Sequence, residues 1–253
     1  MNKSRKQKIS VIIPARYAST RFEGKPLAKI HGQPMIYHVY KRVEKCGLID
    51  ELIVATEDQR IFDVVSDFGG KVVMTSPKHP TGTDRVAEVS EKLDSDIIVN
   101  AQGDEPLIMP EMIAQVVQPL LDDPSIDVTT AITQITSPAD YIDATVVKAV
   151  KDKKGDLLFL TRSPIPFPKT RQRFVIYKQI GLYAFRRPFL RRFVQMEQTG
   201  LELVEGIEFL RLIENGYRVR TAISDYNPIS VDTISDLKEV EKIMAKDKFS
   251  LTY

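Results

Sequence analysis

The sequence predicts an α/β protein with a mostly parallel central sheet and flanking helices. Short apolar runs alternate with amphipathic, helix-like stretches through the first half of the chain. This alternation is typical of parallel strands joined by helical crossovers. At 253 residues the chain is also long enough for one large domain of this class. Its hydrophobic fraction of 43% and charged fraction of 28% are those of an ordinary globular protein.

Net charge and cysteine content restrict the expected partner and compartment. The chain has 36 Lys and Arg against 34 Asp and Glu, a net charge of +2. Because the charges balance, we expect neither nucleic acid nor an anionic membrane as partner, and any basic chemistry must be local. No apolar run approaches membrane-spanning length, so we expect no membrane insertion. A lone cysteine, Cys46, cannot form an internal disulfide, and the N-terminus lacks a signal-peptide pattern. We therefore expect a cytoplasmic protein whose basic residues 1–8 form a disordered terminus.

The first half is predicted to alternate between buried strands and helices. The strands are apolar runs bounded by polar residues, glycine or proline, at 11–13, 51–56, 71–74 and 96–100. The helices carry apolar residues at intervals of three and four, at 34–45, 61–68, 86–93 and 112–121. Gly47 stands where the first helix would end.

The second half is predicted to be richer in strands, at 128–135, 146–150, 157–160, 179–185 and 218–223. Helices are expected at 188–195, 204–215 and 234–246. A short Lys-Lys-Gly-Asp turn joins the second and third of these strands, which indicates a hairpin. Prolines at 164, 166 and 168 then favour an extended segment. We expect one domain over 9–246, containing a strand-rich acceptor and dimer region at 132–185, and a tail at 247–253.

The loop after the first strand is the first candidate site. It carries three cations, Arg16, Arg21 and Lys25, two hydroxyls, Ser19 and Thr20, and also Gly24. Cations, hydroxyls and backbone N–H groups together can enclose phosphates, and a glycine lets the backbone approach them. The loop has neither the Walker pattern nor Gly-x-Gly-x-x-Gly. The alternative is a solvated basic loop.

Two aspartates that follow extended runs are candidate metal ligands. Asp104 comes just after the strand at 96–100, at the edge of the sheet where open α/β folds bind ligands. Mg²⁺ favours one or two carboxylates together with phosphate oxygens. Asp104 could instead be a turn residue that bonds its own backbone. Asp232 could likewise cap the following helix, although a Thr233–Asp236 box would cap it without that carboxylate.

Further polar residues allow weaker interpretations. The turn Thr81-Gly-Thr-Asp-Arg85 opens a helix, and its N–H groups and arginine could bind an anion or a base edge. It could equally be a plain N-cap with a solvent-facing arginine. Arg162 and Lys178 could bind an acidic substrate or be surface charges. No Ser-His-Asp or Cys-His arrangement is apparent, so covalent hydrolase chemistry is disfavoured.

Taken in order, the motifs resemble those of a known family. PARYASTRFEGKPL, TGTDR, NAQGDEP, TRSPIPF, GLYAF and VDT are similar to the motifs of the 3-deoxy-manno-octulosonate (Kdo) cytidylyltransferases, from about Ile9 to Ile243. The resemblance implies a nucleotide-diphospho-sugar transferase fold of the glycosyltransferase-A-like kind with a strand-rich dimerisation lobe. It also implies CTP and an acidic sugar as substrates, Mg²⁺ as cofactor and a homodimer.

The resemblance also implies roles for residues at the matching positions. It places Arg16, Lys25, Asp104 and Asp232 in catalysis, and the two aspartates on the metal. It places CTP at Ala15, Arg16, Ser19, Thr20, Lys25, Thr81, Gly82, Arg85 and Gln102. It places the sugar acid at Arg162, Tyr183 and Glu208. The other candidate sugar-acid residues are Lys178, as a nearby cation, and Gln179 and Phe209, which depart from the family's usual residues in the same pocket.

The implied reaction is in-line attack by the 2-hydroxyl of a 3-deoxy-2-ulosonic acid on the α-phosphorus of CTP. CMP-sugar acid and pyrophosphate would be the products, for lipopolysaccharide or capsule sugar activation. Three positions depart from the family's usual residues, with Thr161 in place of Ser, Gln179 in place of His and Phe209 in place of Gln. They leave open an 8-amino-Kdo, nonulosonate or phosphonate acceptor. A non-catalytic CTP-binding regulator is the other alternative.

Overall fold

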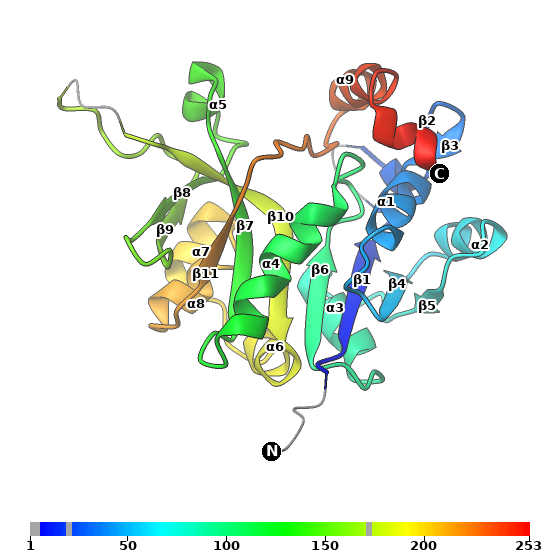
Figure 1. Cartoon of the computed structure of the whole chain (residues 1–253), viewed down its shortest axis with the longest axis horizontal. Helices are drawn as coiled ribbons and strands as arrows, with labels where there is room; N and C mark the ends of the chain where they lie inside the picture. Colours follow the sequence, from blue (N-terminus) through cyan, green and yellow to red (C-terminus); the bar gives the residue numbers. More distant parts are fainter. Residues whose placement is uncertain (1–5, 19–21, 171–173) are drawn as a thin grey trace. The chain divides into compact units, whose positions relative to one another are not determined.

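The computed structural model describes residues 6–18, 22–170 and 174–253 (Figure 1). The chain forms two compact units, and each is described by itself. Unit 1 comprises Met1–Ala114 and Pro228–Tyr253, and unit 2 comprises Gln115–Asn227. No helix in the described ranges has the length and apolar character needed to cross a membrane.

Unit 1 contains four parallel strands in the order β6-β1-β4-β5. Their bounds are Ile9–Ala15 for β1, Glu51–Thr56 for β4, Val72–Met74 for β5 and Ile97–Ala101 for β6. Every residue of β1 is buried, because it lies between two neighbours and under helices on both faces. The predicted parallel sheet with flanking helices is confirmed.

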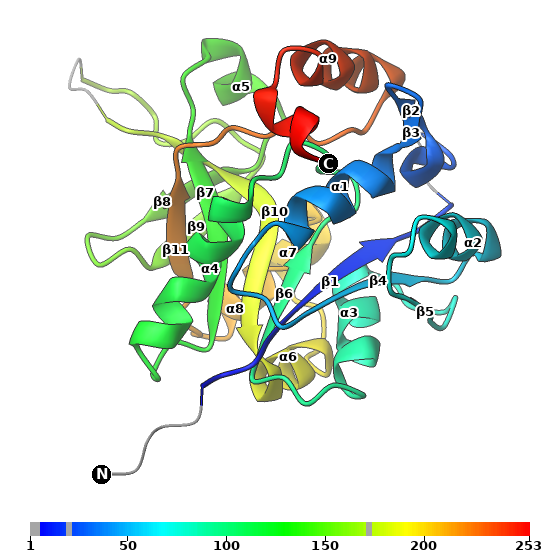
Figure 2. The same cartoon turned by 45° about the vertical axis from the view of Figure 1, so that its right-hand side comes forward.

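The α-helices described in the connections between these strands are α1 Met35–Glu44, α2 Gln59–Asp67 and α3 Gly82–Ser90. The chain moves outward from β1 to β4 and β5, then returns across β1 to β6. Because such crossovers are right-handed, α3 covers the face opposite to α1, as Figures 1 and 2 show. The carboxyl ends of β1, β4 and β6 therefore meet at one edge, where the loops after them converge.

A small apolar cluster supports the segment that carries Asp232. A short 3₁₀-helix η1 (Lys25–Leu27) leads into the hairpin β2 (Lys29–Ile30) and β3 (Gln33–Pro34). Helix α9 (Ile234–Met244) packs beside this hairpin, as seen in Figure 2. The buried side chains that join them are Ile30, Met35, Val231, Val240 and Met244.

Residues 247–253, expected as a tail, form the 3₁₀-helix η2 (Lys248–Thr252) and contact α1. The guanidinium of Arg42 is 1% exposed. It donates to Asp247, to Ser250 Oγ at 2.8 Å and to Tyr253 Oη at 3.0 Å. A buried arginine needs such partners, because an unpaired buried charge is strongly destabilising.

Unit 2 is built around β7 (Val128–Gln134), with β10 (Tyr177–Arg186) antiparallel on one side and β11 (Arg220–Ser224) parallel on the other. Strands β8 (Lys148–Lys151) and β9 (Leu157–Thr161) form the predicted hairpin, and β8 also pairs with β10. Among the described residues, the helices wholly within this unit are α5 (Pro138–Ile142), α6 (Arg187–Val194), α7 (Gly200–Glu205) and α8 (Leu210–Glu214). Helix α4 (Pro110–Asp122) runs across the boundary between the units.

The prediction of one helix at 204–215 is wrong. Helix α7 ends at Glu205, Gly206 follows it with a left-handed φ of 64°, and α8 begins at Leu210. A left-handed glycine ends a helix at little cost, but apolar residues continue at helical spacing beyond it. A periodicity argument therefore merges the two helices. Helix α5 was also missed, because none of its residues is buried and it has no apolar stripe.

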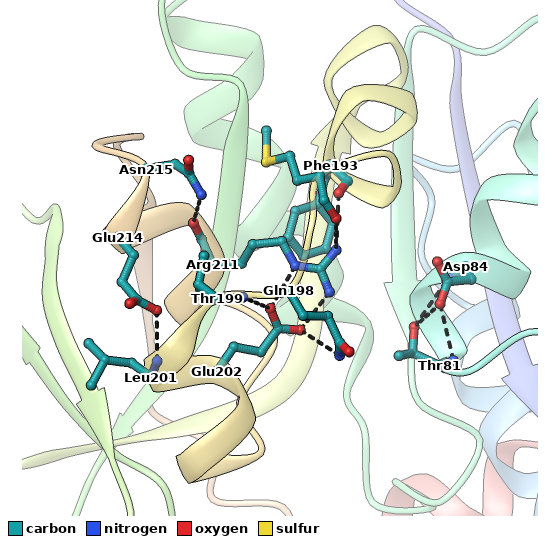
Figure 3. Close-up of polar contacts among 11 residues, drawn as sticks. Thr81, Asp84, Phe193, Gln198, Thr199, Leu201, Glu202, Arg211, Glu214 and Asn215 are labelled. Carbon is teal, nitrogen blue, oxygen red and sulfur yellow. Dashed lines mark hydrogen bonds and ion pairs between the residues drawn. The ribbon is translucent and has the colours of Figure 1, made fainter.

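A buried ion pair joins α7 to α8 (Figure 3). The Arg211 guanidinium donates to Glu202 from Nε at 2.7 Å and from Nη2 at 2.5 Å. Its Nη1 donates to the Phe193 and Met196 carbonyls at the end of α6. Burial raises the pKa of Glu202, but the bonds from Arg211 outweigh it and the net pKa is lowered.

Candidate active site

The loops at the carboxyl edge of the unit 1 sheet enclose a cavity of about 410 Å³. Its lining comes from the end of β1, the cation-rich loop, the start of α3, the loop after β6 and the segment before α9. The lining residues are Pro14, Ala15, Arg16, Ala18, Lys25, Pro26, Gly82, Gln102, Gly103, Asp104 and Asp232. The structure thus brings the predicted phosphate loop and both candidate metal ligands to one cavity.

Lys25 lies at the centre of this arrangement. Its Nζ donates to Asp104 Oδ2 at 2.5 Å, to Asp232 Oδ1 at 3.2 Å and to the Val231 carbonyl at 3.2 Å. Burial by itself lowers the pKa of Lys25. The two carboxylates raise this pKa by a larger amount, so the net pKa is above its ordinary value. The lysine is therefore held as an ammonium ion between two carboxylates.

The positions of the two carboxylates follow from local structure. A Cβ on Gly103 would lie 2.9 Å from the Pro14 carbonyl, so only glycine allows the loop after β6 to pass this close to β1. The Asp104 carbonyl accepts from Val231 N–H at 2.9 Å, which joins this loop to the segment before α9. Thr233 and Asp236 form the capping box of α9, so the Asp232 carboxylate is directed to Lys25 instead.

The donor set fits a hard divalent cation. Two carboxylate oxygens and one carbonyl oxygen surround a single positive centre, and all come from unit 1. Among residues 6–18, 22–170 and 174–253, no three His, Cys, Asp or Glu side chains are grouped to hold a metal by themselves. Mg²⁺ is commonly held by one or two carboxylates, with substrate phosphates and water completing its octahedron. Asp104 and Asp232 meet that description.

The cation-rich loop is anchored near its two ends. Gly24 N–H donates to the Tyr17 carbonyl at 2.9 Å, and the Tyr17 ring lies against Gly24. On α2, the Arg60 guanidinium stacks 3.2 Å from the Tyr17 ring centre and is itself held by Asp58. These contacts fix the backbone from which the Arg16 and Lys25 side chains extend. The predicted contributions of Ser19 and Thr20 lie outside the described residues.

The start of α3 forms part of the cavity wall. Thr81 and Asp84 form the capping box of this helix (Figure 3), and Gly82 follows directly on the cavity wall. A Cβ on Gly82 would lie 3.3 Å from the Pro14 ring, so glycine keeps this wall open. The Gln102 amide, also on the wall, donates to Asn100 at 3.0 Å.

Arg85 does not line the cavity. It is 1% exposed, lies 2.7 Å from Glu57 and donates to Thr75 Oγ1. Burial lowers the pKa of Arg85 despite the opposing effect of Glu57. Glu57 is not among the residues predicted from the sequence. Glu57 follows the buried strand β4, and an acidic residue shortly after a buried strand is the pattern by which Asp104 was predicted.

The predicted sugar-acid residues all lie in unit 2, where several already have protein partners. Lys178 pairs with Asp140 at 3.3 Å, and the Gln179 amide donates to Thr130 Oγ1 at 3.2 Å. Phe209 is 1% exposed, and its ring centre lies 4.5 Å from the ring centre of Tyr183. It also packs against the rings of Phe185 and Phe193. Glu208 stands beside Phe209, just before α8.

Arg162 is fixed by a carboxylate that the sequence analysis missed. Glu205 accepts from Thr161 Oγ1 at 2.5 Å and from Arg162 N–H at 3.0 Å. The Arg162 side chain donates from Nε to the Glu205 carbonyl and from Nη1 to the Ala144 carbonyl. The threonine hydroxyl therefore holds Glu205 in place, and a serine would offer the same oxygen. No sequence signal marked Glu205, because its partner is 43 positions away.

A family model described as cytidylyltransferase matches residues 10–223. The 3-deoxy-manno-octulosonate cytidylyltransferase of Geobacter metallireducens is 50% identical over 248 residues, covering 93% of this chain and 98% of that protein. The protein of the same name from Geotalea uraniireducens is 49% identical, covering 94% of this chain and all of that protein. This chain belongs to the Kdo cytidylyltransferase family.

A solved structure agrees with that family membership. CMP:2-keto-3-deoxy-manno-octonic acid synthetase complexed with CTP superposes with a TM-score of 0.90 at 40% identity. The match covers 95% of this chain and 99% of that one. A cytidylyltransferase from Leptospira borgpetersenii is 15% identical with a TM-score of 0.64, which supports the fold alone. The resemblance drawn from the motifs and the predicted nucleotidyltransferase fold are therefore confirmed.

Proposed function

We propose that the protein transfers CMP from CTP to Kdo, forming CMP-Kdo and releasing pyrophosphate. The observation that carries this function is the meeting of Lys25, Asp104 and Asp232 in one cavity at the carboxyl edge of the sheet. A chain that only bound CTP would not need two carboxylates directed at one cation. Family membership supports the same reaction, since the relatives named above are Kdo cytidylyltransferases.

In this reaction the chain supplies position and charge rather than a covalent intermediate. Arg16, on the wall of the cavity, and Lys25 would take the negative charge that develops on the departing pyrophosphate. Gly82 keeps the wall open beside the Pro14 ring, where the nucleoside would lie, and Gly103 lets the loop after β6 pass close to the Pro14 carbonyl. Arg85, which pairs with Glu57, and Thr81 remain proposed CTP-binding residues at the start of α3.

Asp104 and Asp232 would hold Mg²⁺. Bound there, the ion would neutralise phosphate oxygens and favour attack at the α-phosphorus. The two carboxylates would fix its place, and the Val231 carbonyl stands beside them. In unit 2, Arg162, Lys178, Gln179, Tyr183, Glu208 and Phe209 remain the proposed sugar-acid residues.

The function is tested by measuring pyrophosphate release from CTP in the presence of Mg²⁺. The acceptors to compare are Kdo, 8-amino-Kdo, a nonulosonate and a phosphonate. We expect Kdo to be turned over with the highest kcat/KM, and ATP in place of CTP to be a poor donor. Higher kcat/KM for another acid would reassign the acceptor. Tight CTP binding without pyrophosphate release from any acceptor would identify a regulator instead.

Anchoring of the cation-rich loop predicts a change in the KM for CTP. Arg60→Ala removes a cation–π contact worth about 0.5–1 kcal/mol at an exposed site, so the KM for CTP should rise about two- to fivefold. The value of kcat should change little, because Arg60 does not line the cavity. Tyr17→Phe keeps the ring and should match the wild type in steady-state kinetics. An unchanged KM for CTP in Arg60→Ala would contradict this anchoring role.

We also propose a cytoplasmic homodimer. Unit 2 exposes large apolar side chains around the predicted dimer region at 132–185, including Ile142 at 70%, Phe167 at 84% and Phe174 at 62%. Exposed apolar groups of this size commonly mark a protein interface. Sedimentation should give the mass of a dimer at micromolar concentration, and Phe167→Asp should shift it toward monomer. A wild-type monomer would exclude the dimer. The buried free thiol of Cys46 supports the cytoplasmic location.

A further inference from the structure

The ammonium of Lys25 is fully coordinated by oxygen. An ammonium ion has three N–H donors. Here three oxygens accept from them, those of Asp104 Oδ2, Asp232 Oδ1 and the Val231 carbonyl, at 2.5, 3.2 and 3.2 Å. The Lys25 side chain is 14% exposed, so these contacts form in a mostly desolvated place. Charge-assisted bonds are strong there.

These oxygens are also the donors proposed above for the divalent cation. Carboxylate and carbonyl oxygens are the ligands of Mg²⁺ and Mn²⁺. One centre cannot hold a divalent ion and an ammonium ion at the same time, because the two positive charges would repel at contact distance. In this arrangement the Lys25 ammonium therefore stands where the cation has to bind.

The Lys25 side chain can leave this place without moving the backbone. Lys25 opens η1, and Gly24 at φ 68° holds the preceding turn through bonds to Tyr17 and Leu27. The backbone is thus fixed, while the lysine stem has four rotatable carbons. A triphosphate in the cavity offers the ammonium a denser negative charge than two shared carboxylates.

We propose that Lys25 closes the Asp104–Asp232 pair to free divalent cations, and that the triphosphate opens the pair by drawing the ammonium away. The proposal rests on the proposed function, because it takes CTP as the ligand. It assigns Lys25 two successive partners, the carboxylates before CTP binds and the phosphates afterwards. Metal binding is then coupled to the presence of the nucleotide.

The test measures Mn²⁺ binding to the protein without nucleotide, by the loss of the free-ion signal in electron paramagnetic resonance. Wild type should bind Mn²⁺ no more tightly than Asp232→Asn does. Lys25→Met should bind it at least about tenfold more tightly than wild type, since a charge-assisted competitor is removed. Lys29→Met is the matched control, because it removes an exposed lysine of β2, and it should behave as wild type.

Two further measurements complete the test. The double variant Lys25→Met/Asp232→Asn should lose the gain in Mn²⁺ affinity, which places that gain at the carboxylate pair. Calorimetry with CTP in EDTA should show about tenfold weaker binding to Lys25→Met than to wild type. If circular dichroism shows Lys25→Met unfolded, Lys25→Gln replaces it with the same expectations.

Equal Mn²⁺ affinity of wild type and Lys25→Met would overturn the proposal. A gain that survives Asp232→Asn, or unchanged metal-free CTP binding by Lys25→Met, would also overturn it. These results are separable from the reaction itself. If wild type releases no pyrophosphate, the proposed function fails while the Mn²⁺ comparison still reports on Lys25. If wild type is active and Lys25→Met shows no gain, only the closure by Lys25 fails.

Discussion

Asp104→Asn is expected to lower kcat for pyrophosphate release about a hundredfold to a thousandfold, the usual cost of removing one preorganised electrostatic contact. The substitution keeps the shape of the side chain but removes the charge that holds Lys25 at 2.5 Å and that would hold the metal. Because Asp104 is 25% exposed rather than deeply buried, the folded structure should persist. Initial rates at saturating CTP and Kdo with Mg²⁺ give the comparison.

Two other aspartates make this result interpretable. Asp232→Asn should lower kcat to a similar degree, since Asp232 is the second carboxylate at the same centre. Asp67→Asn changes an exposed carboxylate at the end of α2 and should leave both kcat and the melting temperature unchanged. A near wild-type rate for Asp104→Asn would remove it from the catalytic centre. Loss of the circular dichroism signal would assign it a structural role.

Arg211→Met is expected to lower the free energy of unfolding by about 3–5 kcal/mol, because it leaves the Glu202 carboxylate unpaired in the interior. The Arg211 side chain is 7% exposed and that of Glu202 is 4% exposed. One edge of the guanidinium donates to Glu202, and Nη1 donates to the Phe193 carbonyl (Figure 3). Urea denaturation followed by circular dichroism measures the loss. Lys154→Met removes an exposed cation from the β8–β9 turn and should change stability by less than about 0.5 kcal/mol. A loss below about 1 kcal/mol in Arg211→Met would show that the pair is not a major contributor.

The same pair predicts a dependence of stability on pH. The pKa of Glu202 in the folded protein is lowered from its ordinary value of 4.5. A carboxyl with a lowered folded-state pKa contributes stability above its unfolded pKa and loses it as the pH falls through the folded value. Wild type should therefore lose stability steeply below pH 4.5, and the difference from Glu202→Gln should shrink over the same range. Denaturation curves at pH 7, 5, 4 and 3 check the sign, and a constant difference would contradict it.

The local pattern of residues was enough to locate most elements and the key carboxylates. The strand at 51–56 was predicted with the bounds that β4 has, because a short apolar run between polar residues is a local feature. Asp104 was identified because it lies shortly after such a run, at 96–100. The same reasoning did not predict the helix end at Gly206. A left-handed backbone at one residue leaves the apolar spacing on either side unchanged.

Tertiary structure alone decided which charges meet. Lys25 reaches Asp104 across 79 positions and Asp232 across 207, and Arg42 reaches Asp247 across 205. Arg85 is buried with Glu57, although its sequence neighbourhood is that of an ordinary helix start. Hydrophobic periodicity reports how each segment folds along its own axis, whereas the partner of a charge depends on which segment ends the packed sheet brings together. For that reason the sequence determined most of the elements, the family and most of the candidate residues of this protein, and only the fold decided that one lysine and two aspartates share a single centre.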